Sequence, residues 1–178
     1  SFVDAPSGTL VKIADGNTTG ASVSYVDVAQ CFSSTYKIYK LIMSYNINTG
    51  GYLEVGLLNA SDNSHNSSTY YSLGGGWYSN NNSGNTRYTG GANNSNFHQS
   101  DSNGYRVINT WGSYKTDEHN QTEITFDDPI STKKTMVKME STWSQTNYVG
   151  WIAGIGMHDQ ASSMSGIRLN SSSGNNFT

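Results

Sequence analysis

The residues of this chain that could do chemistry are few, and the densest group is Asp117-Glu118-His119, with Glu123 close behind. Carboxylate and imidazole groups held together can ligate a cation or transfer protons in acid–base catalysis. The same residues also suit a polar turn ahead of a strand, and we favour that interpretation because turns far outnumber such sites. His158-Asp159 has the same two interpretations, whereas His65 and His98 stand apart in the sequence.

A second candidate for ion binding is Asp127-Asp128-Pro129, whose oxygens could form half of a calcium site. Aspartate before proline is also typical of a turn that ends a strand, which we favour. The chain has no nucleophile elbow, phosphate-binding loop, zinc-protease motif or cysteine pair. We therefore predict a protein that is not an enzyme, with no catalytic residue, no cofactor and no bound metal.

Aromatic residues provide the candidate binding site. Trp77, Tyr78 and Tyr88 lie in a stretch rich in Asn, Ser and Gly. Flat aromatic faces stack on sugar rings while Asn and Ser supply hydrogen bonds, and adaptable binding loops use the same residue types. We predict these three residues as contacts for a glycan or a protein partner; the alternative is that they cap a β core. The other tryptophans fit strand alternation and are predicted to lie in the core: Trp111, Trp143 and Trp151.

The elements that must position these residues are strands. Apolar residues recur at the spacing of a half-buried strand, and no stretch shows the period of a long helix. We expect an all-β fold, an antiparallel β-sandwich of jelly-roll-like type, with about ten short strands. The expected strands cover residues 10–13, 21–29, 36–47, 53–57, 70–78, 105–111, 123–126, 134–143, 148–157 and 164–169.

Two of these strands carry specific expectations. Residues 36–47 form the longest one, which we place at the centre of a sheet because apolar residues line both faces. Asn48-Thr49-Gly50-Gly51 then predicts a hairpin to the next strand. Residues 148–157 alternate between apolar residues and glycines, and the glycine face implies a flat surface or a close backbone approach. The apolar face carries Val149, Trp151, Ala153, Ile155 and Met157.

Length and composition suit one domain over residues 1–178. The 178 residues include 12% aromatic and only 13% charged residues, with a net charge of −3, so the chain can bury a core. No basic patch for nucleic acid and no apolar run for a membrane is present, so neither partner is expected. The single cysteine, Cys31, favours assembly in a reducing cytosol. Residues 79–103 are predicted to be a long Asn/Ser/Gly-rich loop region, with short irregular strands around Tyr88 and Phe97 as the alternative.

Three segments carry a resemblance to known proteins: Tyr36–Ser44 with Tyr52–Val55, Ile124–Pro129 (I-T-F-D-D-P), and Ser165–Asn175 (S-G-I-R-L-N-S-S-S-G-N). In their order around an Asn/Ser/Gly-rich middle, residues 36–178 resemble β-sandwich virion proteins of marine and cyanobacterial phages. The resemblance implies a tail-fibre, adhesin or capsid-decoration component at the virion surface, assembled in the host cytoplasm.

The phage proteins continue with a closing strand where this sequence ends, at Asn176-Phe177-Thr178. Either the sequence is a fragment that lacks its last strand, or the sandwich has an open C-terminal edge that another chain completes, in a homo-oligomer or a repeating assembly. The expected function is non-enzymatic contact with copies of itself and other virion proteins, and attachment to a host-surface glycan. The alternative class is a carbohydrate-binding or lectin-like jelly roll, with a polysaccharide-cleaving enzyme behind it.

Overall fold

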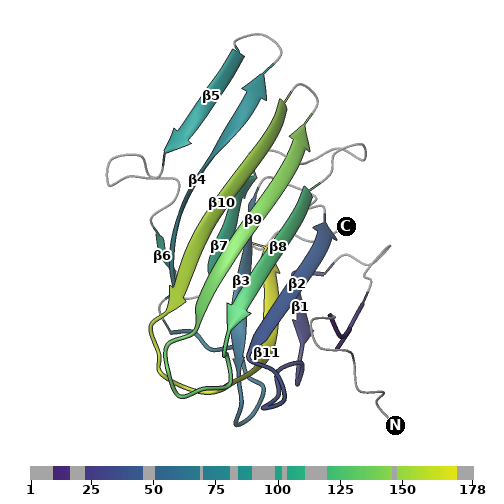
Figure 1. Cartoon of the computed structure of the whole chain (residues 1–178), viewed down its shortest axis with the longest axis vertical. Helices are drawn as coiled ribbons and strands as arrows, with labels where there is room; N and C mark the ends of the chain where they lie inside the picture. The colour runs from purple at the N-terminus through teal and green to yellow at the C-terminus, as the bar shows by residue number, and fades with distance from the viewer. Residues whose placement is uncertain are drawn as a thin grey trace.

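The computed structural model describes residues 10–16, 23–45, 51–68, 70–80, 84–89, 99–101, 104–110, 120–145 and 148–171. These residues form strands and connections without a helix (Figure 1). The strands are β1 (Tyr25–Val28), β2 (Ile38–Tyr45), β3 (Gly51–Asn59), β4 (Tyr70–Asn80), β5 (Gly84–Thr89), β6 (Gln99–Asp101), β7 (Tyr105–Thr110), β8 (Asn120–Asp127), β9 (Met136–Gln145), β10 (Tyr148–His158) and β11 (Met164–Ser171).

The strands make two antiparallel sheets packed face to face. The small sheet has four strands in the order β1-β11-β3-β7. The large sheet has seven, in the order β2-β8-β9-β10-β4-β5, with β6 also paired to β4. The chain changes sheet six times among the described strands: between β1 and β2, β2 and β3, β3 and β4, β6 and β7, β7 and β8, and β10 and β11. The predicted all-β sandwich is confirmed.

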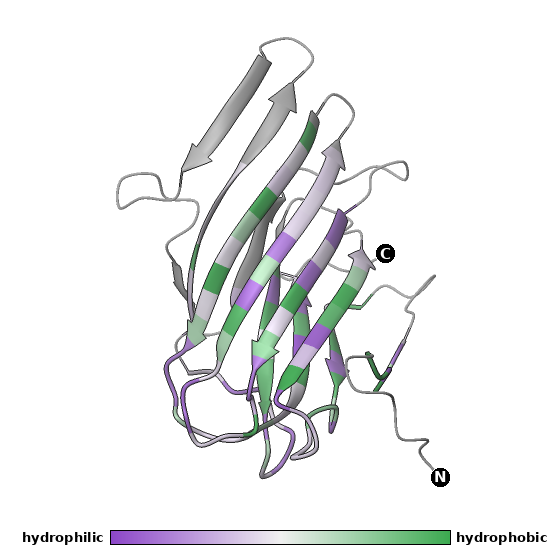
Figure 2. Ribbon diagram, in the orientation of Figure 1, coloured by the Kyte–Doolittle hydropathy of each residue, from purple (hydrophilic) through white to green (hydrophobic). Residues whose placement is uncertain are grey.

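The core lies between the sheets, and in β8 and β9 it takes every second residue. In β8, Ile124 is fully buried while its neighbour Glu123 faces outward, and in β9 Val137 is buried while Lys138 is exposed. Figure 2 shows this alternation along β8 and β9, as the sequence predicted for both strands. Large buried side chains come from both sheets and include Leu53, Val55, Leu57, Tyr70, Tyr105, Phe126 and Met139.

β2 lies at the edge of the large sheet, so the central position predicted for residues 36–47 is wrong. β2 pairs only with β8 among the described strands, and Ile38 and Ile42 on its outer face are 58% and 59% exposed. Its inner face carries Tyr39 and Leu41 as expected. The predicted hairpin does not pair β2 with β3, because these strands lie in different sheets; residues 46–50 are outside the described part.

The N-terminal expectations hold only in part. Residues 10–13 form no strand, and Leu10 is 79% exposed because no described strand pairs with this segment. β1 is confirmed within the strand expected over residues 21–29. Val23 packs against the core with Val26, although strict alternation would place it on the same face as Tyr25. A bend at residue 24 separates Val23 from the strand and breaks the alternation.

Two further expectations change with the topology. Within residues 79–103, where the sequence predicts a long loop region with short strands as the alternative, the structure has strand β5, which includes Tyr88, and the short strand β6. Phe97 is outside the described residues. β11 pairs with β1 on one side and β3 on the other. It is therefore not the open edge that we expected.

The glycine face of β10 points into the core. The Tyr105 ring from β7 lies over Gly156, where an added Cβ would be 2.6 Å from Tyr105 Cδ1. The Trp143 indole of β9 lies directly against Gly150, its register partner. The predicted close approach at these glycines is confirmed, and so is the packing of Trp143 against the core.

The apolar face of β10 consequently points to solvent. Trp151, predicted to be a core residue, is 41% exposed, and Val149 and Ile155 on the same face are 59% and 48% exposed. The prediction for Trp151 is wrong. The rings of Tyr105 and Trp143 fill the space inside the sandwich next to β10, so the face that carries Trp151 cannot point inward.

A methyl group at Gly156 tests this packing. Gly156→Ala should lower the free energy of unfolding by about 1–3 kcal/mol, because the methyl meets the Tyr105 ring and Val137 with no room to relax. Gly16→Ala is the matched control, since nothing lies within 4 Å of its Cβ position, and should change stability by less than about 0.5 kcal/mol. Urea unfolding of both variants measures the difference, and equal effects would contradict the account.

Candidate binding groove on the large sheet

The three residues predicted as binding contacts lie in paired strands. Trp77 and Tyr78 are in β4, and Tyr88 is in β5. Trp77 stands in register with Trp151 on one side and Arg87 on the other. Tyr78 is in register with Gly150, and Tyr88 with Gly76. Their side chains lie outside the described part of the structure, so the predicted contacts stay predictions.

The acidic candidates are placed only in part. Asp117-Glu118-His119, His98 and Trp111 lie outside the described residues. Asp128 adopts a left-handed conformation with φ 41° in a turn and pairs with Lys37 at 3.1 Å, which confirms the turn interpretation. Among the described residues, no group of three or more His, Cys, Asp and Glu is arranged to hold a metal ion.

His158 is fully buried at the end of β10. Its Nε2 lies 3.1 Å from Asn66 Oδ1. The Asn66 amide nitrogen donates to Asn59 and Gln160, so Oδ1 is the acceptor and Nε2 donates the hydrogen bond. The imidazole also packs on the Tyr70 ring at 4.6 Å between centroids. This network ties the β3–β4 connection to the one after β10, which is a structural role.

Burial of the imidazole lowers the pKa of His158 below its ordinary value of 6.5. A hydrogen bond with the Gln160 backbone and the charge of Asp159 oppose this shift, and His65 adds to it slightly. The folded state therefore resists protonation that the unfolded state accepts. The stabilisation is fully present above pH about 6.5 and is lost as the pH falls toward the folded-state pKa. Tyr70 and Tyr105, which pack nearby, have pKa values raised by burial and stay neutral in this range.

We expect the free energy of unfolding to fall by up to about 1.4 kcal/mol per pH unit below pH about 6.5. His158→Gln should lose this component of the pH dependence. Urea unfolding between pH about 7.5 and 5.5 gives the stabilities, and NMR of the His158 Cε1 proton follows its titration. Titration of His158 at or above its ordinary value would contradict the prediction.

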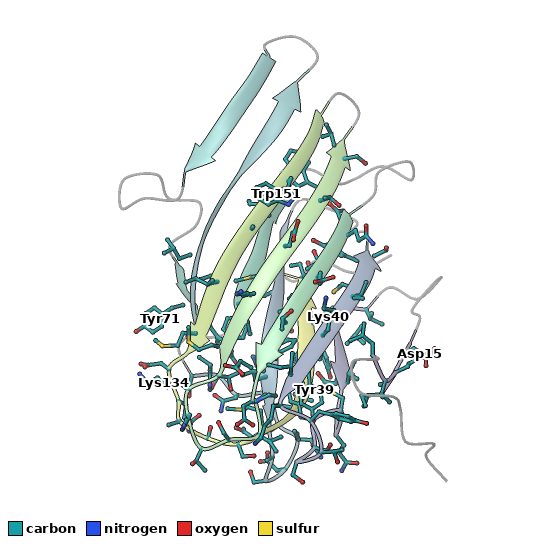
Figure 3. The ribbon with its side chains drawn as sticks, viewed as in Figure 1. Asp15, Tyr39, Lys40, Tyr71, Lys134 and Trp151 are labelled. Carbon is teal, nitrogen blue, oxygen red and sulfur yellow. The ribbon has the colours of Figure 1, made fainter. Side chains whose placement is uncertain are left out.

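The outer face of the large sheet contains a shallow groove of about 470 Å³. Its floor includes Ala153 of β10, whose register partner in β4 is Gly75, so neither position raises a long side chain there. The adjacent row across the same strands carries Leu73 and Ile155, which form an apolar wall. On the other side of Ala153, one row away, stands Trp151, labelled in Figure 3. The low floor between taller rows creates the groove.

Polar groups from β8 and β9 close one end of the groove. The row of Gly75 and Ala153 continues into Glu140 of β9 and Glu123 of β8, which are direct cross-strand partners. Trp151 Nε1 donates a hydrogen bond to Glu140 Oε1 at 2.6 Å. Lys40 of β2 pairs with Glu123 at 2.7 Å. Two further groups line the wall: Thr125 and Lys138.

Sequence reasoning missed this site. The sequence groups Glu123 only with Asp117-Glu118-His119, and Glu140 belongs to none of the sites predicted from it. Their meeting depends on the pairing of β8 with β9, in a register that places them opposite each other. The sequence does carry one signal for this site: Lys138 and Glu140 alternate with apolar residues in the strand expected over residues 134–143, which places both side chains on its outer face.

The groups that line the groove are suited to binding a polar ligand. Glu123 and Glu140 both lie at the surface, where a ligand can reach them. Glu140 already accepts a hydrogen bond from Trp151, and Glu123 already forms an ion pair with Lys40. An ionised carboxylate has further acceptor positions, so both can still bind hydroxyl or amide donors.

Comparisons with known proteins give the chain no class. No protein-family model, no curated protein and no solved structure matches it. The described residues also contain no helix long and apolar enough to span a membrane.

Proposed function

We propose that this protein is a non-enzymatic structural component of a phage virion surface, which acts through contacts with copies of itself, neighbouring virion proteins and the host surface. The observation that carries the proposal is the outer face of the large sheet. This face exposes large apolar side chains across its width, at 41–59% of their surface: Ile38, Ile42, Leu73, Met136, Val149, Trp151 and Ile155.

Exposed apolar patches of this breadth are typical of interaction surfaces. In Figure 1 the face is turned toward the viewer, and no described strand or connection crosses it. The opposite face of the same sheet is covered by the small sheet. The apolar outer residues are therefore not part of the core of this chain, and contact with other molecules explains them.

The β2 edge of the large sheet suits contacts between copies. Its outer face exposes Ile38 and Ile42, and its second edge has no partner among the described strands. Edge strands with β-branched side chains pair readily with strands of another chain. The resemblance over residues 36–178 supports placing such an assembly on a virion.

Self-association should be concentration-dependent and should weaken in Ile42→Lys, because the charge is placed beside Lys40 on the contact strand. Leu10→Lys is the control, because Leu10 is 79% exposed and lies outside the large sheet. Size-exclusion chromatography with light scattering gives the masses. A wild-type protein that stays monomeric at high concentration, or an equal effect of both variants, would contradict assembly through β2.

The location of the gene tests the virion assignment separately. Adjacent genes for capsid or tail proteins are expected. A position among metabolic genes of a cellular chromosome would overturn the assignment while leaving the contact surface unaffected.

A further inference from the structure

We propose that the groove over Ala153, together with the neighbouring Trp151 indole that is bonded to Glu140 of its lining, binds a neutral glycan, with a sugar ring stacked on the indole and its hydroxyls bonded to Glu140, Glu123 and Lys138. This inference rests on the proposed function, because it names the ligand class through which the surface would attach to a host. It moves the glycan site from the residues predicted by sequence to β8, β9 and β10.

The indole of Trp151 is held in place before any ligand arrives. Its Nε1 donates to Glu140 at 2.6 Å, and the strand beneath it lies inside the sheet, paired on both sides. A ring that is fixed and 41% exposed can stack on the apolar face of a sugar with little loss of side-chain entropy.

The polar groups beside the indole match the hydroxyls of a sugar. Glu140 and Glu123 supply acceptors, Lys138 supplies a donor, and Thr125 supplies either. Lys138 is exposed and forms no ion pair with any described residue. A sugar combines an apolar ring face with peripheral hydroxyls, so it satisfies both parts of the groove, whereas a purely apolar ligand would leave the carboxylates desolvated.

Charge favours an uncharged ligand. The two carboxylates of Glu123 and Glu140 are balanced by the ammonium groups of Lys40 and Lys138, so these groups have no net charge. An anionic sugar would face the carboxylate pair at the end of the groove, and its repulsion from that pair would offset its attraction to Lys138. The groove therefore prefers neutral to sulfated or uronic-acid units.

The position of the groove argues against an extended peptide. Peptides commonly bind a sheet by adding a strand to an open edge, using backbone hydrogen bonds. The groove lies over β8, β9, β10 and β4, each of which is paired on both sides. Recognition here must use side chains alone, which suits a sugar that stacks and accepts hydroxyl contacts.

The test is calorimetric titration with soluble oligosaccharides of about four to six units. Neutral gluco-, manno- and galacto-oligosaccharides are compared with sulfated and uronic-acid chains of equal length. At least one neutral series should bind the wild-type protein and should bind more tightly than the charged chains. Trp151→Ala should weaken binding by about tenfold or more, as loss of a central tryptophan usually does.

A second variant addresses the groove independently of the indole. Ala153→Leu should also weaken binding about tenfold by filling the floor. Val149→Leu is its matched control, on the same face of β10 but outside the groove, and should bind within about twofold of wild type. Thermal unfolding of each variant confirms that the fold persists, as expected for substitutions on the outer face.

Three results would overturn the inference: no neutral oligosaccharide binds, charged chains bind more tightly, or Trp151→Ala and Ala153→Leu bind as the wild type does. Cleavage of a bound oligosaccharide on long incubation would instead assign catalysis to Glu123 and Glu140 and overturn the non-enzymatic function. Absence of binding in a protein that still self-associates through β2 would remove the glycan and leave the structural role intact.

Discussion

The rings of Tyr105 and Trp143 lie against two glycines on the inner face of β10, and this contact determines the arrangement of the large sheet. Tyr105 reaches across from the small sheet, and its hydroxyl donates to the Thr135 carbonyl at 3.1 Å. Two rings of this size fit only because Gly156 and Gly150 leave the backbone bare. Each added Cβ would overlap a ring, so the glycines set how closely the two sheets approach.

The binding face follows from the same contact. Successive residues of a strand point to opposite faces, so a glycine face in the core places Trp151 and Ile155 in solvent. Exposed apolar residues of this size are unfavourable for an isolated domain and are retained where they contact another molecule. Ala153 and Gly75 then separate the two apolar rows. The groove is thus the outer counterpart of the packing that stabilises the core.

Local sequence pattern predicted the strands and most of their alternation, but not the side of the sheet that each face occupies. The faces of β8 and β9 were predicted correctly because charged Lys138 and Glu140 alternate with apolar residues. β10 offers no such contrast, since glycine and tryptophan are both compatible with a core. The edge position of β2 and the pairing of Glu123 with Glu140 depend on strand order and register, which are set by contacts between residues distant in the sequence.

The large sheet offers two kinds of contact, which differ in whether the backbone of the strand involved is already hydrogen-bonded on both sides. At β2 an edge has no described partner, so another chain can add hydrogen bonds there, and specificity comes from Ile38 and Ile42. At β10 every backbone edge is paired, so a ligand meets only side chains fixed by the sheet. A rigid floor lowers the entropy lost on binding and makes affinity depend on a few groups, chiefly Trp151 and Glu140. A strand added at the β2 edge would extend the large sheet in its own plane and leave the outer face of β8, β9 and β10, over which the groove lies, uncovered. One sheet can therefore hold a copy of the chain and a ligand at the same time.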